Sequence, residues 1–127
     1  MHEPPYGILL CDDLIFVSRI TGTAKALDLR LRSVKTPSDL LQFVKQSVPR
    51  CVIVDLHTPG LSLEELVREL SAMQPKPLLV GYGSHVDTVT LKNARTAGCD
   101  IVWPRSKFVD ELPTALPSWF QQAETTS

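Results

Sequence analysis

Long apolar runs, closely spaced cysteines and clustered charge of one sign are all absent from this sequence. No apolar stretch approaches the ~20 residues of a membrane-spanning helix. The first residues, Met1-His2-Glu3-Pro4-Pro5, lack the basic and then apolar layout of a secretory signal peptide. The three cysteines sit in or beside apolar runs without the close spacing of metal-binding motifs. We therefore expect buried thiols in a cytoplasmic protein with no membrane partner.

The charge pattern also argues against a nucleic-acid partner. The formal net charge is −1, and the basic residues are scattered along the chain. A DNA- or RNA-binding surface needs a basic cluster, so we expect no contact with nucleic acid. The 127 residues are 43% hydrophobic and 21% charged, which is typical of a soluble globular protein. This composition predicts a single domain over residues 1–127, with its core at about 6–122.

Strand-like and helix-like segments alternate along the chain. Short apolar runs predict strands at 7–11, 29–34, 51–55, 78–80 and 101–103. Amphipathic or capped segments predict helices between them at 14–27, 37–47, 63–73 and 86–97. Gly98 stands where a helix C-terminal cap is expected. Strict alternation of this kind predicts an α/β fold with a doubly wound, five-stranded parallel sheet.

The last segment contains two prolines that predict a broken helix. Pro113 and Pro117 cannot both occupy one undistorted helix, because each lacks a backbone N–H and crowds the preceding turn. We expect a short turn over residues 107–112 and a second helical piece that starts near Pro113.

Three acidic residues stand where apolar runs end. Asp12 and Asp13 follow the first run, and Asp55 closes the third. The carboxyl ends of parallel strands meet at the edge where ligands bind, so we expect the three carboxylates to converge there. An all-oxygen ligand set suits Mg²⁺. Asp12 and Asp13 could instead cap the following helix, but capping does not account for Asp55.

The motifs around these acids resemble those of receiver domains from two-component response regulators. The matching segments are Leu10-Cys11-Asp12-Asp13 and Val54-Asp55-Leu56-His57-Thr58-Pro59, and the element order is similar from Gly7 to Leu112. The resemblance implies a flavodoxin-like sheet of order 2-1-3-4-5, with Asp55 as the phosphoacceptor and Asp12 and Asp13 holding Mg²⁺. It also implies a histidine kinase or a phosphotransfer protein as the partner. The chemistry agrees, since a carboxylate can attack a phosphoryl group whose charge a metal neutralises.

The sequence departs from the receiver pattern at the end of the fourth strand, where receivers usually carry a Ser or Thr. Counting forward from the strand places Tyr82 at this switch position, whereas counting back from Gly98 places Gly83 there. Ser84 lies one step further along. We interpret Ser84 as the N-cap of the next helix, with Asp87 three residues on, although it remains a switch candidate.

A second departure lies after the fifth strand, where receivers place a Lys followed by Pro. Counting from Gly98 puts Arg105 in the lysine position, whereas aligning the proline puts Trp103 there. Lys107 lies beyond the expected place. Arginine keeps the positive charge but presents its donors in a rigid fork, so the exchange is not neutral. No lysine matches the pattern.

Two other interpretations are less well supported. The letters D-x-H-x-x-G from Asp55 to Gly60 also match a cobalamin-binding signature. In that family the signature follows the first strand of the domain, whereas here two further predicted strands precede the strand that carries it. Phosphohydrolases of similar fold usually place a second acid two residues after the nucleophile, and His57 stands there. We interpret His57 as a loop residue that tunes the charge of the acidic pocket.

The sequence therefore predicts a stand-alone signalling module without a DNA-binding output domain. In one mechanism Asp55 accepts a phosphoryl group within a phosphorelay, and Arg105 or Ser84 partly replaces the missing switch. In the other, an atypical receiver acts through contact with a downstream signalling protein, independently of phosphorylation. Neither mechanism makes the chain an enzyme beyond its own phosphorylation at Asp55.

Overall fold

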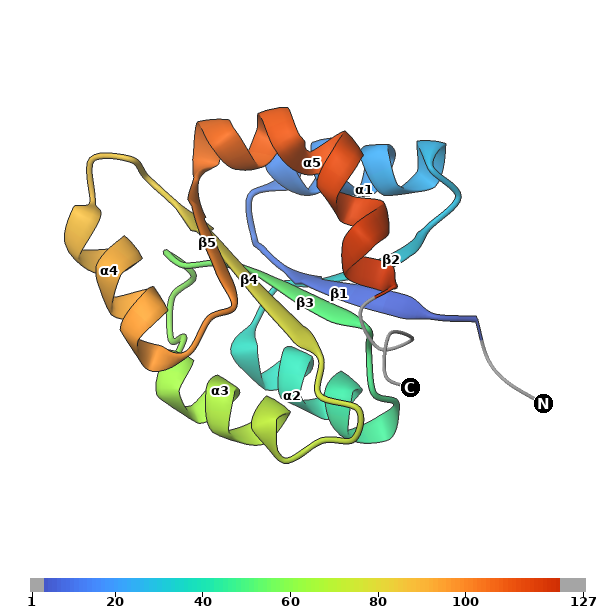
Figure 1. The fold of residues 1–127 in the computed structure, drawn as a ribbon, viewed down its shortest axis with the longest axis horizontal. Helices are drawn as coiled ribbons and strands as arrows, with labels where there is room; N and C mark the ends of the chain where they lie inside the picture. The colour runs from blue at the N-terminus through green and yellow to red at the C-terminus, as the bar shows by residue number, and fades with distance from the viewer. Residues whose placement is uncertain (1–3, 122–127) are drawn as a thin grey trace.

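Strands and helices alternate throughout the computed structural model, which describes residues 4–121 (Figure 1). The N-terminal residues Met1–Glu3 and residue 122, the predicted end of the core, lie outside this range. In chain order the elements are β1 (Tyr6–Leu10), α1 (Leu14–Ala26), β2 (Arg30–Val34), α2 (Pro37–Gln46), β3 (Cys51–Asp55), α3 (Leu63–Ser71), β4 (Leu78–Gly83), α4 (Thr88–Ala97), β5 (Ile101–Pro104) and α5 (Arg105–Phe120).

The five strands form one parallel sheet in the order β2-β1-β3-β4-β5, which confirms the predicted topology. All five residues of β3 are buried, in keeping with a central strand that helices cover on both faces. At the sheet edge, β2 reads Arg-Leu-Arg-Ser-Val, and only Val34 of its residues is buried.

Helices cover both faces of the sheet (Figure 1). On one face, α1 and α5 pack against side chains such as Leu9 and Ile53; on the other, α2 and α3 pack against Ile8 and Val52. Successive strand residues thus point into opposite layers. Helix α4 packs beside β5, where Leu91, Ala94 and Val102 form a smaller cluster.

Strand β4 continues through Gly83, three residues beyond its predicted end. Gly81 and Gly83 suggest a loop by composition, yet they pair with Val102 and Pro104 of β5. A Cβ atom at Gly81 would lie 2.9 Å from the Leu56 side chain, so the missing side chain allows the next loop to approach the strand. As a consequence, Tyr82 lies inside the sheet.

Polar side chains cap the helices that begin at the carboxyl edge of the sheet. Asp13, Ser62 and Asp87 are the N-caps of α1, α3 and α4. The interpretation of Ser84 as the α4 cap was wrong: the Asp87 carboxylate accepts both the N–H and the hydroxyl of Thr90. Gly98 ends α4 with φ of +119°, which confirms its predicted role.

The prediction of a broken last helix was also wrong, because α5 is one helix of 16 residues. Pro113 is exposed and Pro117 half-buried, so their rings do not enter the core. The opposite side of the helix buries five large side chains, whose packing offsets the lost backbone hydrogen bonds: Phe108, Leu112, Leu116, Trp119 and Phe120. The ribbon changes direction along its length instead of breaking (Figure 1).

Candidate acidic site at the carboxyl edge of the sheet

Asp55 ends β3 and faces the carboxyl edge of the sheet. Only 8% of its surface is exposed, and its Oδ1 accepts the backbone N–H of His57 at 2.9 Å. Its Oδ2 lies 3.9 Å from the Cys11 sulfur, which can donate a weak hydrogen bond. No cation of residues 4–121 forms an ion pair with this carboxylate. Asp55 is therefore a buried acid with unused acceptor capacity.

The loop after β3 folds back so that it supports Asp55. Thr58 is buried, and its N–H and hydroxyl both donate to the Asp55 carbonyl oxygen, at 3.0 and 2.7 Å. The N–H of Leu56 donates to the Tyr82 carbonyl of the neighbouring strand at 2.9 Å. These hydrogen bonds give Thr58 a structural role three residues after Asp55. Together they hold the backbone at and after the acid.

His57 joins this loop to the loop that follows β4. Its Nε2 accepts the N–H of Ser84 at 3.0 Å, and its Nδ1 lies 4.0 Å from a carboxylate oxygen of Asp87. A Cβ atom at Gly83 would lie 3.1 Å from the same Nε2, so glycine makes room for the imidazole. The sequence motifs did not predict this bridge: Ser84 and Asp87 were paired in a helix cap, and nothing linked His57 to either of them.

The two acids after β1 occupy different environments. The Oδ1 of Asp13 accepts the N–H groups of Ile15 and Phe16 at 3.0 and 3.2 Å, so this side chain caps α1. Asp12 is exposed and forms no hydrogen bond or ion pair with the described residues. The helix-capping alternative is therefore realised for Asp13, but not for Asp12.

The predicted acidic trio is not assembled as a preformed metal cage. Within residues 4–121, no three His, Cys, Asp or Glu side chains lie close enough together to hold a metal ion. Mg²⁺ needs less than this, because it binds through one or two carboxylates and keeps several waters or phosphate oxygens. Asp55 and Asp12 have free oxygens for such binding, and Asp13 retains Oδ2. The donor chemistry of the edge thus fits Mg²⁺.

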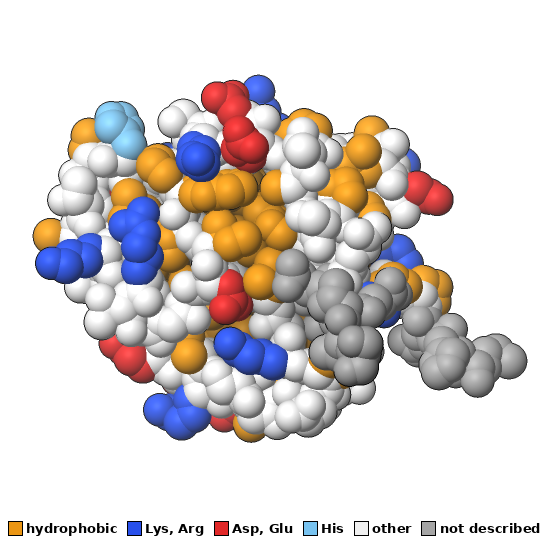
Figure 2. All heavy atoms as spheres, in the orientation of Figure 1, with side chains coloured by type: hydrophobic (Ala, Val, Ile, Leu, Met, Phe, Trp, Pro, Cys, Tyr) orange, Lys and Arg blue, Asp and Glu red, His pale blue; other side chains and the backbone are white. Residues whose placement is uncertain are grey.

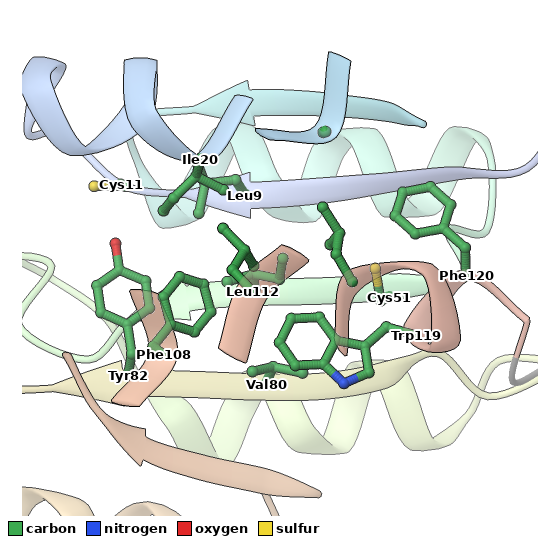
Figure 3. Close-up of a cluster of buried hydrophobic side chains, with 13 residues drawn as sticks. Leu9, Cys11, Ile20, Cys51, Val80, Tyr82, Phe108, Leu112, Trp119 and Phe120 are labelled. Atoms are coloured by element: carbon green, nitrogen blue, oxygen red, sulfur yellow. The ribbon is translucent and has the colours of Figure 1, made fainter. Parts of the chain in front are cut away.

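Tyr82, the first switch candidate, is fully buried in an aromatic cluster. Its ring centroid lies 4.6 Å from that of Phe108 and 5.1 Å from that of Phe16. The hydroxyl points toward Cys11 (Figure 3) but has no hydrogen-bond partner of normal geometry within the described residues. Burial raises the pKa of Tyr82 above its ordinary value, and burial likewise raises the pKa of the Cys11 thiol.

The other two switch candidates lie apart from the acid. The Ser84 hydroxyl accepts the N–H of Val86 at 3.3 Å in the turn before α4. Arg105 begins α5, and its guanidinium lies 5.6 Å from the centroid of the Phe16 ring. No hydrogen bond or ion pair joins either side chain to Asp55 within residues 4–121. Of the three switch candidates, Tyr82 is the one that pairs with Asp55 in the sheet, as its register partner on β4.

Comparison with known proteins gives matches in structure but not in sequence. No protein-family model matches the chain, and no curated protein does. A response regulator from Hahella chejuensis superposes with a TM-score of 0.81 at 17% identity, over 97% of this chain and 100% of its own. A beryllofluoride-activated receiver domain, DrrB, gives 0.75 at 16% identity, over 91% and 97%.

A third match is the receiver domain of a Saccharomyces cerevisiae response regulator, crystallised with the histidine phosphotransfer protein upstream of it. Its TM-score is 0.78 at 14% identity, over 94% of this chain and 91% of its own. The chain has the receiver-domain fold. In this receiver-like domain, Asp55, Asp12 and Asp13 lie at the carboxyl edge of the sheet, where α/β folds of this type bind ligands. None of the helices in residues 4–121 is long and apolar enough to cross a membrane.

Basic side chains are spread over the face seen in Figure 2, where they form no continuous stripe. Hydrophobic side chains gather on that face over α5 instead. The visible face thus carries no concentrated positive charge of the kind that phosphate backbones attract.

Proposed function

We propose that the chain is a receiver-like signalling domain in which Asp55 accepts a phosphoryl group. The observation that carries this proposal is the position of Asp55: a nearly buried carboxylate at the end of β3, without an ion-pair partner in residues 4–121. Its Oδ1 is held by the His57 N–H, so Oδ2 is the oxygen left to react. The receiver-domain fold supports the same role.

In the proposed transfer, Asp55 Oδ2 forms a bond to phosphorus while the bond from phosphorus to the donor breaks. The donor is a phosphohistidine, whose imidazole nitrogen leaves with the electron pair, or a small acyl phosphate, whose carboxylate leaves. Asp55 and Asp12 would hold Mg²⁺, with Asp13 as a further candidate ligand, and the metal would neutralise charge on the transferred oxygens. The His57 N–H keeps the carboxylate oriented, and the buried surroundings limit hydrolysis of the product.

Exposed apolar side chains beside this edge are a proposed docking surface for the phosphodonor protein. Leu14 and Ile15 are 68% and 84% exposed at the start of α1, next to the Asp13 cap. Val86, in the turn before α4, and Val89, in the first turn of that helix, are 75% and 66% exposed. Since both helices start at the edge where Asp55 lies, a partner seated there would bring its phosphohistidine to the acid. The complex of the yeast receiver domain supports a phosphotransfer protein as this partner.

A second candidate function is signalling by protein contact without a phosphorylation switch. The buried, stacked ring of Tyr82 favours it, because a side chain packed against Phe16 and Phe108 cannot swing in response to a modified acid without opening the core. Arg105 is likewise held over Phe16. In this case Asp55 could be phosphorylated without a change in the surface that a downstream protein reads.

Intact mass spectrometry after incubation with Mg²⁺ and acetyl phosphate tests the first function. We expect an adduct of one phosphoryl group that is absent from Asp55→Asn and retained in Asp39→Asn, a matched change at an exposed aspartate of α2. An adduct that persists in Asp55→Asn would refute the assignment. No adduct on the wild-type chain with either acetyl phosphate or phosphoramidate would leave the contact mechanism as the better account.

A further inference from the structure

A groove of about 530 Å³ lies between α1 and α5, where the loop after β4 also reaches it. Phe16 and Arg19 line it from α1, and Arg105 and Ser106 line it from the start of α5. None of the acids at the carboxyl edge contributes to its lining. The lining of the groove therefore excludes the proposed phosphoacceptor and Mg²⁺ ligands, although it includes the switch candidates Ser84 and Arg105.

Two arginines give the groove its positive charge. Neither Arg19 nor Arg105 forms an ion pair within residues 4–121, even though Asp110 lines the same cavity. The Arg105 guanidinium carbon lies 5.6 Å from the centroid of the Phe16 ring, a cation–π contact that does not neutralise its charge. Two unpaired guanidinium groups in one cavity favour an anionic ligand.

Neutral hydrogen-bond donors lie beside the arginines. Ser84 and Ser106 line the groove, and helix α5 begins there without a side-chain cap. Its N-cap residue is Pro104, so the first-turn N–H groups have no side-chain acceptor. Guanidinium forks, hydroxyls and a helix N-terminus together match a group with several acceptor oxygens, and phosphate fits them better than a carboxylate does.

We infer that this groove binds a phosphate monoester of about mononucleotide size. Its volume falls within the range of small-molecule sites, and it exceeds what a bare phosphate ion fills. Phe16 and Val109 supply apolar surface for an organic moiety, and Asp110 supplies an acceptor for a hydroxyl or amino group on it. The site needs neither Asp55 nor Mg²⁺.

Amide chemical shifts during titration with adenosine 5′-monophosphate test the inference. The titration is made on Asp55→Asn in EDTA, so that the proposed phosphorylation site does not contribute and the two proposals can fail independently. We expect saturable shifts at Ser84 and Ser106, and none with adenosine. Arg19→Gln should weaken binding by about tenfold or more. Arg68→Gln, a matched change at an exposed arginine of α3, should leave binding unchanged.

A titration with inorganic phosphate distinguishes an organic phosphate from the free phosphate ion as the ligand of the groove. Tighter binding of the nucleotide supports a phosphate monoester as the ligand, whereas equal affinities overturn that inference, because the site would then recognise phosphate alone. The inference is overturned if the nucleotide causes no shift at Ser84 or Ser106 at millimolar concentration. It is also overturned if Arg19→Gln binds as the wild type does, or if Arg68→Gln loses the same affinity, because binding would then reflect net charge alone.

Discussion

Asp55 and Tyr82 are register partners on the adjacent strands β3 and β4, and the N–H that follows Asp55 donates to the Tyr82 carbonyl. The acid points to the edge of the sheet, whereas the Tyr82 ring is buried against Phe16 and Phe108. Receivers usually carry a small hydroxyl residue in this region. In this chain a core aromatic residue, Tyr82, occupies that position. Packing therefore directs the side chain of this switch candidate away from the proposed phosphoacceptor.

The Tyr82 hydroxyl is the first target for a stability test. It is buried without a normal hydrogen-bond partner, and such a group costs ~1–3 kcal/mol of desolvation. Tyr82→Phe keeps the ring stack and removes only this oxygen, so we expect the free energy of unfolding to rise by about 1 kcal/mol in urea denaturation. A fall of similar size would mean that the hydroxyl makes a stabilising bond with a neighbour such as Cys11.

Asp13 caps α1 and is also a proposed Mg²⁺ ligand, and two substitutions distinguish these roles. Asp13→Ala removes the cap of α1, so the free energy of unfolding should fall by about 1 kcal/mol. Asp13→Asn keeps an acceptor oxygen and should retain most of the stability, but it removes a carboxylate from the proposed metal site. We expect Asn to weaken Mg²⁺ binding, measured by titration. Unchanged binding would assign Asp13 to capping alone.

We expect the protein to become more stable when an exposed proline of α5 is replaced. Pro113 is exposed inside a continuous helix, where it removes a backbone hydrogen bond. Pro113→Ala restores the backbone donor but also gives the unfolded chain more conformational entropy. We expect the net free energy of unfolding, measured by thermal denaturation, to rise by about 1–2 kcal/mol. Thr114→Ala, at the exposed neighbour, should change stability by only a few tenths of that amount. A destabilised Pro113→Ala would show that the bend itself is required for packing.

Buried thiols predict a loss of stability at alkaline pH. Burial raises the pKa of Cys51 from an ordinary 9.0 to about 12. The unfolded chain therefore releases this proton first, so the contribution is complete below about pH 9 and is lost as pH rises toward 12. Between these pH values the free energy of unfolding should fall with pH in the wild type. In Cys51→Ala this fall should be about 1.4 kcal/mol per pH unit shallower. Parallel slopes would contradict the assignment.

Much of the fold could be predicted because local patterns and packing agree. The strand at 51–55, the helices predicted at 37–47 and 63–73, and the Gly98 cap all follow from residue types whose local preferences match the final environment. Where local preference and packing conflict, the prediction failed. Pro113 and Pro117 break isolated helices, but five buried side chains keep α5 continuous.

The candidate site was only partly predictable for a similar reason. Strand ends placed Asp55 and the acidic pair at one edge, because the topology of parallel sheets requires it. The direction of each side chain was not encoded in the spacing. Asp13 turned to the helix N–H groups of Ile15 and Phe16, the local alternative to metal binding that the sequence had left open. The His57 side chain instead accepts the N–H of Ser84, 27 residues away, and no local pattern predicts such a partner.

The most direct test of the phosphoacceptor role is a titration with Mg²⁺ and beryllofluoride, followed by amide chemical shifts. The His57 N–H reports on the site, because it donates to the Asp55 carboxylate. We predict saturable shifts at Leu56 and His57 that disappear in Asp55→Asn, with the amides around the buried Tyr82 ring changing little. An unshifted His57 amide in saturating reagent would contradict the account.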